Sequence, residues 1–280
     1  MDKLLIVDGS ALLFQSFYGM PKRIKNEKEQ YVEAVVCFMG ILFKTIRILS
    51  PNKLLVVFDG ENALERQNVV GEYKANRIDY RTVGDEDSPF PQLEIIKEVL
   101  TYLNFKWIET SSCEADDLIA SIVNDYKDKY NNIVISSPDK DFFQLICENV
   151  HVFNYRGKVS KLWTEQAVVD KYGFEAQYFS SFKALYGDQS DNIAGIKGIG
   201  LKTASNLIKQ FGSLVAVYDN LHLLKKHLQQ TLIENKQQAF QNYSIIQLHD
   251  KTNLFVIDDL DFNLLDTISS TNVLRKLEIL

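Results

Sequence analysis

Nine carboxylate residues stand at the ends of strand-like runs or at expected helix starts, spread over two thirds of the chain. They are Asp8, Asp59, Glu114, Asp116, Asp117, Asp139, Asp141, Asp188 and Asp191. Gathered in one cleft, each would raise the pKa of its neighbours unless cations neutralised them. Oxygen ligands without a Cys or His pair at ligand spacing favour Mg²⁺ or Mn²⁺ over zinc. We therefore predict a hard-metal site for phosphate chemistry, in which metal rather than a side-chain base activates water.

Each acidic segment also has a structural interpretation. Residues 111–114 fit a helix capping box, 137–139 fit a capped helix start with an early proline, and the acids of GDQSDN (187–192) suit a helix cap. A haloacid-type phosphatase is disfavoured, because it needs a second Asp two residues after Asp8 and the chain has Ser10 there. The metal interpretation therefore depends on a fold that brings these segments together.

Alternating strands and helices are expected to position the acids. Apolar strands are predicted at 3–8, 53–58, 105–109 and 132–136, and helices at 31–49, 90–103, from 114 and at 141–146. Strands that are apolar throughout favour an α/β fold with a mainly parallel central sheet and helices on both faces. Ligands of such sheets collect at the carboxyl ends of the strands, where Asp8, Asp59 and Asp139 are predicted to lie.

The chain divides into three expected parts. The α/β core is expected over 1–174, and a charged segment at about 61–90 interrupts its alternation of strands and helices. A helical subdomain is expected over 175–250 and a C-terminal return segment over 251–280.

Two further motifs indicate which class of substrate the phosphate belongs to. The first, GEYKANRIDYR, contains Tyr73, Lys74, Arg77 and Arg81. Lys74 and Arg77 are three apart and share a helix face, although a solvated charged face has the same pattern. This segment therefore predicts a basic surface.

The second motif, GIKGIGLKTASNLIKQFG over 195–212, is more specific. Glycines at a helix start expose backbone N–H groups that bind phosphate without reading base sequence. The alternative is an ordinary turn between two helices. The candidate DNA-binding residues are Gly195, Lys197, Gly198, Gly200, Lys202 and Thr203.

Composition sets broad limits. The 280 residues are ample for a core, and no apolar run reaches the ~20 residues of a membrane span. Three widely spaced cysteines argue against a disulfide framework and for a cytoplasmic protein. The net charge of −6 is unusual for a nucleic-acid binder, but without the nine candidate ligands 28 acidic residues face 31 Lys and Arg, which leaves +3. The global acidity therefore does not exclude nucleic acid as a partner.

In order, the motifs VDGSALLF, VVFDG, EYKANR, CEADD, SSPDKDFFQL, GDQSDN and GIKGIGLKTA resemble the 5′–3′ exonuclease and flap endonuclease family. The likeness covers nearly the whole chain and is strongest to the nuclease domain at the front of bacterial DNA polymerase I. No polymerase or proofreading region follows, so we expect a stand-alone nuclease or an excised nuclease domain. The resemblance implies a PIN-like nuclease core, a helical arch and a helix-hairpin-helix type subdomain that binds duplex DNA.

The resemblance also implies roles for single residues. All nine carboxylates become direct or water-mediated ligands of two Mg²⁺ or Mn²⁺ ions, with Asp117 ambiguous between them. Lys74 and Arg77 match arch residues that contact the scissile phosphate, and Tyr73 matches a base-stacking position. The 195–204 hairpin is similar to one that holds K⁺ through backbone carbonyls. The ligands expected nearer one ion are Asp8, Asp59, Glu114, Asp116 and Asp139. Those expected nearer the other are Asp141, Asp188 and Asp191.

Two positions depart from the family pattern. Many relatives have a basic residue in the first helix near Gln15, so steering of the 5′ end is expected to be altered here. Lys197 stands where proline is frequent, and this change leaves the turn intact.

The expected activity is metal-dependent hydrolysis of DNA with a free 5′ end at flaps, nicks or gaps, in replication and repair, giving 5′-phosphate products. Two alternatives stay open: a non-catalytic binder of branched DNA, and a 5′ nuclease that prefers RNA primers. We expect a monomer with no small-molecule cofactor and no membrane partner.

Overall fold

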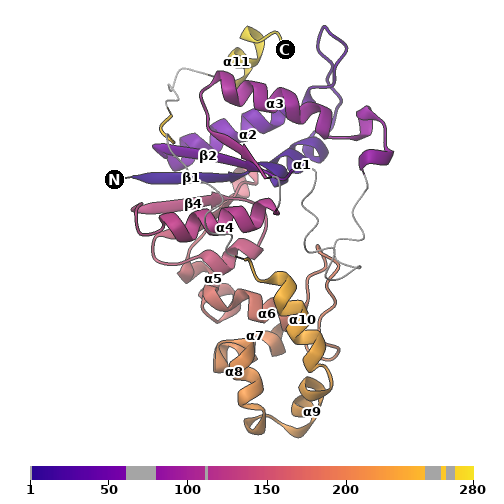
Figure 1. The fold of residues 1–280 in the computed structure, drawn as a ribbon, viewed down its shortest axis with the longest axis vertical. Helices are drawn as coiled ribbons and strands as arrows, with labels where there is room; N and C mark the ends of the chain where they lie inside the picture. Colours follow the sequence, from indigo (N-terminus) through magenta and orange to yellow (C-terminus); the bar gives the residue numbers. More distant parts are fainter. Residues whose placement is uncertain (1, 61–79, 111–112, 250–259, 263–268) are drawn as a thin grey trace.

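The computed structural model describes residues 2–60, 80–110, 113–249, 260–262 and 269–280. At its centre is a six-stranded sheet in the order β3-β2-β1-β4-β5-β6 (Figure 1). The strands are β1 Lys3–Asp8, β2 Lys53–Phe58, β3 Trp107–Glu109, β4 Asn132–Ser136, β5 Val150–Asn154 and β6 Lys161–Trp163. The first five are parallel, and β6 runs antiparallel to β5. The predicted α/β fold with a mainly parallel sheet is confirmed, whereas β5 and β6 had not been predicted.

Alternate residues of the central strands pack into two separate hydrophobic cores, one on each face of the sheet. Leu5 and Val7 of β1 pack in one core with α1 (Gly9–Gly19), α2 (Glu33–Leu49), α3 (Phe90–Tyr102) and α11 (Ser270–Lys276). Leu4 and Ile6 pack in the other with α4 (Ala115–Tyr126) and the helical part. Figure 1 shows the first set of helices above the sheet and α4 below it. A parallel sheet buried on both faces explains why its strands are apolar throughout.

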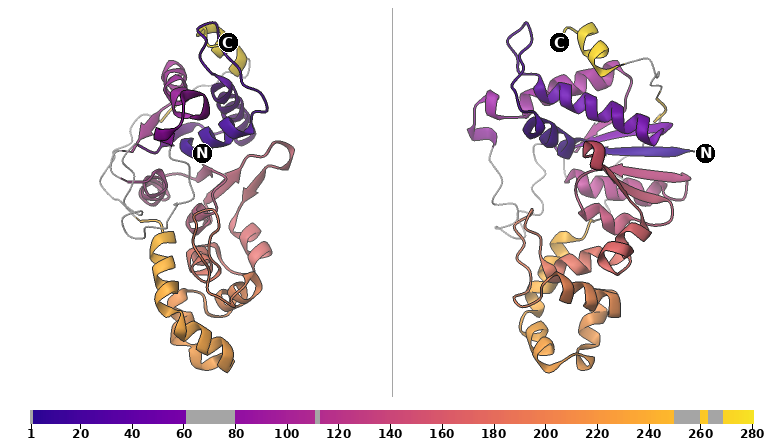
Figure 2. Two further views of the ribbon diagram at one scale, coloured as in Figure 1. Left: turned by 90° about the vertical axis from the view of Figure 1, so that its right-hand side faces the viewer. Right: turned by 180° about the vertical axis from the view of Figure 1, so that it is seen from behind.

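From Glu165 to Ile246 the chain is mainly helical. Its helices are α5 Glu165–Tyr172, α6 Phe179–Tyr186, α7 Leu201–Phe211, α8 Leu214–Asp219, α9 Lys226–Glu234 and α10 Lys236–Ile246. Helices α7 to α10 gather at the end of the molecule opposite α11 (Figure 2). Asn242 of α10 donates side-chain hydrogen bonds to the carbonyls of Ala184 (3.1 Å) and Ala194 (2.9 Å), which fixes α10 against α6 and the following loop.

The described parts of the C-terminal segment return to the sheet. The N–H of Leu54 in β2 donates to the carbonyl of Leu260 at 3.0 Å, and Lys53 pairs with Asp261 at 2.7 Å. Val273 and Leu274 of α11 are buried in the first core. Among the described helices, none is long and apolar enough to cross a membrane. Of the predicted arch, residues 61–79 lie outside the described part of the chain, and 80–82 and 85–87 form two single 3₁₀ turns.

Candidate metal centre and nucleic-acid interface

Asp8 connects the carboxyl ends of β1 and β4. Its Oδ1 accepts a hydrogen bond from the N–H of Ala11 at 2.9 Å and so caps α1. Its Oδ2 accepts one from the Ser137 hydroxyl at 2.7 Å, and that hydroxyl accepts one from the N–H of Asp139 at 3.0 Å. Asp8 and Asp139 therefore flank one serine at the edge of the sheet where the strand pattern predicted them to meet.

Asp59 joins β2 to the starts of two helices. Its N–H donates to the Ser10 hydroxyl at 2.8 Å, and its Oδ1 accepts from the N–H of Ala115 at 2.7 Å. The first turn of α4 is thus capped by a carboxylate from another segment, and the helix dipole favours the negative charge there. Glu114, 6% exposed, is the residue just before α4. This arrangement brings Asp59 to the same helix start as Glu114.

A second acidic group lies beside the first. Oxygen atoms of Asp141, Asp188 and Asp191 all lie within 4.8 Å of one another, the one such set of three among the described residues. The N–H of Asp141 donates to Oδ1 of Asp139 at 2.8 Å. A turn connecting Asp139 to Asp141 therefore joins the two acidic groups. The helix predicted to follow is a short 3₁₀ helix, Asp141–Leu145.

The loop after α6 brings Asp188 and Asp191 to this place. Asp188 and Ile193 form an antiparallel bridge, with backbone hydrogen bonds of 2.8 and 2.7 Å in the two directions. Oδ1 of Asp188 also accepts from the N–H of Ser190 at 2.9 Å. The loop is therefore closed by its own hydrogen bonds, and it holds both carboxylates against Asp141.

The Lys183 ammonium lies inside this second group, and the sequence did not point to it. Its Nζ forms ion pairs with Oδ1 of Asp141 and Oδ2 of Asp188. Lys183 is 6% exposed and is the one charged residue of its helix, FSSFKALY. A lone lysine in a buried helix just before an acidic loop was the signal available, because a buried ammonium requires anionic partners.

Burial and crowding shift several pKa values at this centre. Burial raises the pKa of the Asp8 carboxyl to about 7, and the neighbouring charges of Asp59 and Asp139 add to the rise. Burial also raises the pKa of Asp141, with Lys183 opposing it. Burial lowers the pKa of Lys183, but the attraction of Asp141, Asp139 and Asp188 together outweighs this effect and the net shift is upward. Such a centre is costly without cations.

Asp117 has a structural contact. Its side chain is buried, and Oδ1 accepts a hydrogen bond from the N–H of His249 at 2.9 Å. This bond attaches the chain after α10 to the first turn of α4. Asp116 is half-buried in the same turn. The structure thus gives Asp117 a role in holding the return of the chain, whatever else it binds.

The glycine-rich hairpin leads into α7, but its glycines serve different purposes. A Cβ on Gly195 would lie 2.1 Å from the carbonyl oxygen of Tyr186, so this glycine is required for packing. Gly198 has φ of +89°, and Gly200, at the N-cap of α7, faces open space. Lys197 and Lys202 are exposed, and Thr203 is half-buried. Gly195 therefore has a packing role, and it is followed by exposed residues suited to a backbone phosphate, Lys197, Gly198, Gly200 and Lys202.

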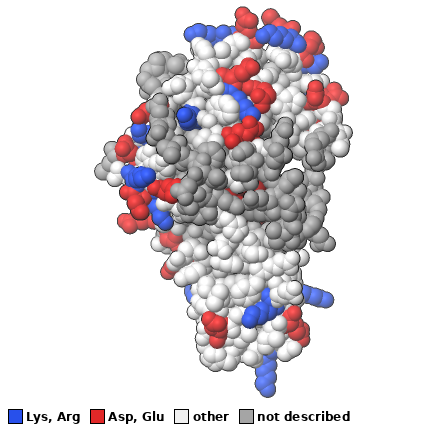
Figure 3. Space-filling view, in the orientation of Figure 1, with Lys and Arg blue, Asp and Glu red and all other residues white. Residues whose placement is uncertain are grey.

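Local charge at the helical end differs from that of the whole chain. Between Gly195 and Ile246 there are six lysines and two acidic residues. Figure 3 shows basic side chains projecting from this lower part of the molecule, with few acidic ones on that face. A locally basic surface is the electrostatic feature that DNA backbone binding requires.

The other predicted residues of the basic segment cannot be placed. Tyr73, Lys74 and Arg77 lie outside the described residues, and Arg81 is described only as part of a 3₁₀ turn. Gln15, at the position where relatives are frequently basic, donates from Nε2 to the carbonyl of Tyr155 at 3.0 Å. Its amide therefore connects α1 to the end of β5.

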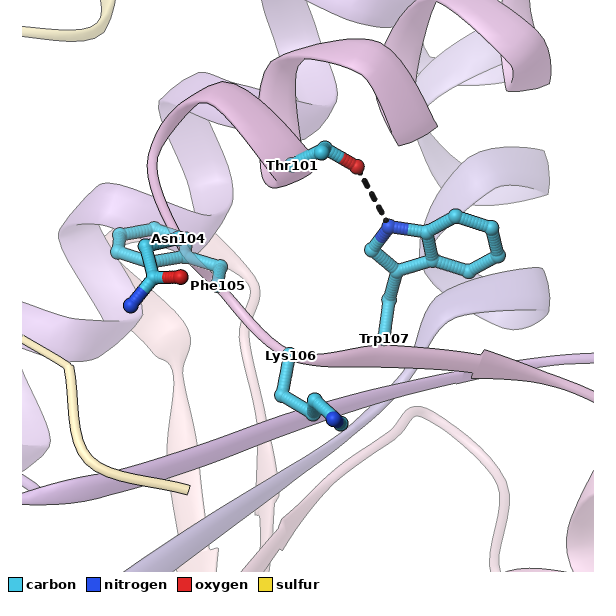
Figure 4. Close-up of a pocket in the computed structure, with 5 residues that line it drawn as sticks. All are labelled: Thr101, Asn104, Phe105, Lys106 and Trp107. Atoms are coloured by element: carbon cyan, nitrogen blue, oxygen red, sulfur yellow. Dashed lines mark hydrogen bonds between the residues drawn. The ribbon is translucent and has the colours of Figure 1, made fainter. Parts of the chain in front are cut away.

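A shallow depression elsewhere has no connection with the acidic centre. It is lined by Thr101, Asn104, Phe105, Lys106 and Trp107, beside the amino end of β3 (Figure 4). Trp107 Nε1 donates to Thr101 Oγ1 at 3.0 Å across it. The acidic groups lie at the opposite, carboxyl ends of the strands, so this depression is not part of the candidate centre.

Comparison with known proteins agrees with the geometry. The family described as "5'-3' exonuclease, N-terminal resolvase-like domain" matches residues 3–173, and "5'-3' exonuclease, C-terminal SAM fold" matches 174–267. A 5'-3' exonuclease of Aquifex aeolicus is 32% identical over 89% of this chain and 82% of its own length. A DNA polymerase I of Caldicellulosiruptor bescii is 35% identical over 85% of this chain, which spans 28% of that relative.

Solved structures show the same architecture. The T5 D15 protein, co-crystallised with metal ions, superposes with a TM-score of 0.70 at 25% identity, covering 88% of this chain and 89% of that one. The catalytic core of Rad2 shares the fold at a TM-score of 0.60 and 16% identity, covering 98% of this chain and 88% of that one. With both family descriptions matched in order along nearly the whole chain, the protein belongs to the 5′–3′ exonuclease family.

Proposed function

We propose that this protein is a divalent-metal-dependent 5′–3′ exonuclease and flap endonuclease that hydrolyses DNA phosphodiesters to leave 5′-phosphate products. The observation that carries the proposal is the pair of adjacent acidic groups, Asp8 with Asp139 and Asp141 with Asp188 and Asp191. A stand-alone relative carries the name 5'-3' exonuclease. The T5 D15 flap endonuclease was crystallised in a pseudo-enzyme–product complex with DNA and metal ions.

The donor set fits two hard cations. Every candidate ligand offers carboxylate oxygen, the donor that Mg²⁺ and Mn²⁺ prefer. Asp117, whose Oδ1 accepts the His249 N–H, is proposed as a direct or water-mediated ligand of one of the two ions. We propose that one ion is held by Asp8, Asp59, Glu114, Asp116 and Asp139. The other is held by Asp141, Asp188 and Asp191.

The residues around the metal centre have separate proposed roles. When bound, two such ions activate water and stabilise charge on the phosphate oxygens. Asp8, Ser137 and Asp139 hold the ends of β1 and β4 together, so the ligands are fixed before substrate arrives. Lys74 and Arg77 are proposed to contact the scissile phosphate and offset its developing charge. Tyr73 is proposed to stack on a base, and Arg81 to bind backbone phosphate.

The exposed part of the hairpin is proposed to bind duplex backbone. Lys197, Gly198, Gly200, Lys202 and Thr203 surround the start of α7, whose N–H groups suit a phosphate. We also propose that backbone carbonyls of residues 195–204 hold K⁺.

A cleavage assay separates this function from its alternatives. A 5′-labelled flap, a blunt duplex and an RNA-primed duplex are each incubated with Mg²⁺ or with chelator. We expect rapid cutting of the flap with Mg²⁺, slower cutting of the other two, and no cutting in chelator. Equal binding of branched DNA with and without Mg²⁺, and no cleavage, would instead establish a non-catalytic binder. Preference for the RNA-primed duplex would establish the RNA-directed alternative.

Lys202→Ala is expected to weaken duplex affinity roughly uniformly across sequences and to reduce the slope of log Kd against log salt by about 1. The exposed lysine contacts phosphate rather than base edges, so one counterion fewer is released on binding. Fluorescence anisotropy across a salt series measures both effects, with Lys44→Ala as the matched control, an exposed lysine on α2 in the α/β core. Identical salt slopes for the wild type and Lys202→Ala would remove Lys202 from the interface.

Mg²⁺ at millimolar concentration is expected to raise the melting temperature, and by more at pH 8 than at pH 6. Bound cations relieve repulsion among the buried carboxylates, and ligand linkage adds to the stabilisation. Because burial raises the pKa of Asp8 to about 7, protons compete with metal at pH 6 and compete little at pH 8. Scanning calorimetry measures the shift relative to the same protein in chelator. No shift at either pH would count against a shared metal cleft.

A further inference from the structure

The Lys183 side chain occupies the place where a cation would bind in the second acidic group. Its Nζ contacts one oxygen of Asp141 and one of Asp188. These two residues and Asp191 are the described acids whose oxygens lie within 4.8 Å of one another. An ammonium and a divalent ion would therefore draw on the same carboxylate oxygens.

The backbone that carries Lys183 is fixed. Its neighbours Phe182 and Ala184 are buried in the core, and its own carbonyl accepts from the N–H of Gly187 at the end of α6. Asn242 of α10 bonds the carbonyl of Ala184 at 3.1 Å. The helix cannot easily move away, so any exchange between ammonium and metal has to occur through the flexible lysine stem.

We propose that Lys183 is a built-in counter-cation: it neutralises the Asp141–Asp188 pair in the metal-free protein and thereby lowers the affinity of this group for a divalent ion. The proposal rests on the proposed function, in which these carboxylates are metal ligands. Lys183 is a positioning residue, since it acts through the ligands.

The direction of the effect follows from charge and does not depend on where the ammonium goes. If Lys183 stays in place, its positive charge repels an incoming ion only a few ångströms away. If it withdraws, two ion pairs in a buried setting are lost, and the binding of metal has to compensate for that loss. In both cases the free protein holds the ion at this group less tightly than three carboxylates alone would.

The same ion pairs stabilise the fold without metal. Three buried or half-buried carboxylates this close repel one another, and removing the ammonium that pairs with two of them weakens the opposition to that repulsion. Lys183 therefore has two linked effects of opposite sign: it stabilises the apo protein and weakens the second metal site.

The test is Mn²⁺ titration of the full chain, followed by electron paramagnetic resonance of free Mn²⁺, for the wild type, Lys183→Met, Lys183→Arg and Lys226→Met. Methionine keeps most of the stem without the charge. We expect Lys183→Met to bind the weaker of two Mn²⁺ ions at least tenfold more tightly. Lys183→Arg, which keeps the charge, is expected to stay within about threefold of the wild type. Lys226→Met, an exposed lysine on α9, is expected to match the wild type.

Melting temperatures give a second, independent measurement. We expect Lys183→Met to melt about 5 °C or more below the wild type in chelator, and to recover most of that difference with Mn²⁺. If Lys183→Met folds only with Mn²⁺, that dependence is the same effect in a stronger form and supports the proposal.

The outcomes distinguish the two proposals. A wild type that binds no Mn²⁺ would overturn the proposed function itself. A wild type that binds two Mn²⁺ ions, with Lys183→Met no tighter, would overturn the role of Lys183 alone. Tightening in Lys183→Arg equal to that in Lys183→Met would also overturn it, because the charge would then not be the cause.

Discussion

Asp139→Asn is expected to lower the rate of flap cleavage by at least about 10³-fold while the protein stays folded. Asp139 lies between the two acidic groups: its N–H bonds the same Ser137 hydroxyl that donates to Asp8, and its Oδ1 accepts from the N–H of Asp141. Asparagine retains a side-chain oxygen that can accept the Asp141 N–H. The substitution therefore removes the negative charge and spares the turn.

Single-turnover cleavage of a 5′-labelled flap at saturating Mg²⁺ measures the effect. Asp125→Asn is the matched control, because Asp125 is exposed near the far end of α4, at the opposite end from Glu114. The control is expected to cut at the wild-type rate. An Asp139→Asn protein with an unchanged melting temperature and wild-type cleavage would show that this carboxylate has no part in the chemistry.

Gly195→Ala is expected to destabilise the protein by about 2–4 kcal/mol. The new Cβ would lie 2.1 Å from the carbonyl oxygen of Tyr186, a backbone atom that cannot rotate away. Gly187, packed against the same place with φ of +89°, has no room for an adjustment either. Relief would require the loop between these two glycines to shift, and this loop carries Asp188 and Asp191. Metal binding is therefore expected to weaken together with stability.

Gly200→Ala is the matched control five residues further on. Gly200 has φ of −85°, and nothing lies within 4 Å of an added Cβ. The stability of the Gly200→Ala protein is therefore expected to stay within about 0.5 kcal/mol of the wild type. Urea unfolding monitored by circular dichroism compares the two variants. Equal unfolding midpoints would mean that the close approach of Gly195 to Tyr186 is not a packing constraint.

The fold was largely predictable because the strands that build it are apolar and bounded by clear signals. The runs at 3–8 and 53–58 are buried on both sides. The first ends in Asp8 and the second is followed by Asp59, and each Asp caps a neighbouring helix. β6 was missed because Lys161 and Leu162 are exposed at the sheet edge, so the strand has no apolar pattern. The 11-residue α1 was implied only by the resemblance, as a first helix near Gln15, because its sequence continues directly from β1.

The acidic residues of the candidate site could be predicted from the sequence, whereas the residues that contact them could not. Residue type and position at strand ends identify the carboxylates, since these properties are local. The ion pairs of Lys183 and the serine shared by Asp8 and Asp139 are long-range contacts that depend on how α6 and β4 pack. Likewise, the sequence could not separate Gly195, which packs against Tyr186, from Gly200, which faces open space. Three-dimensional packing decided each of these.

Anomalous scattering from crystals soaked in Mn²⁺ tests the central claim most directly. The account predicts two peaks at the carboxyl edge of the sheet, one beside Asp8 and Asp139 and one among Asp141, Asp188 and Asp191. Crystals that diffract well but show no manganese at either place would contradict a two-metal centre built from these acids.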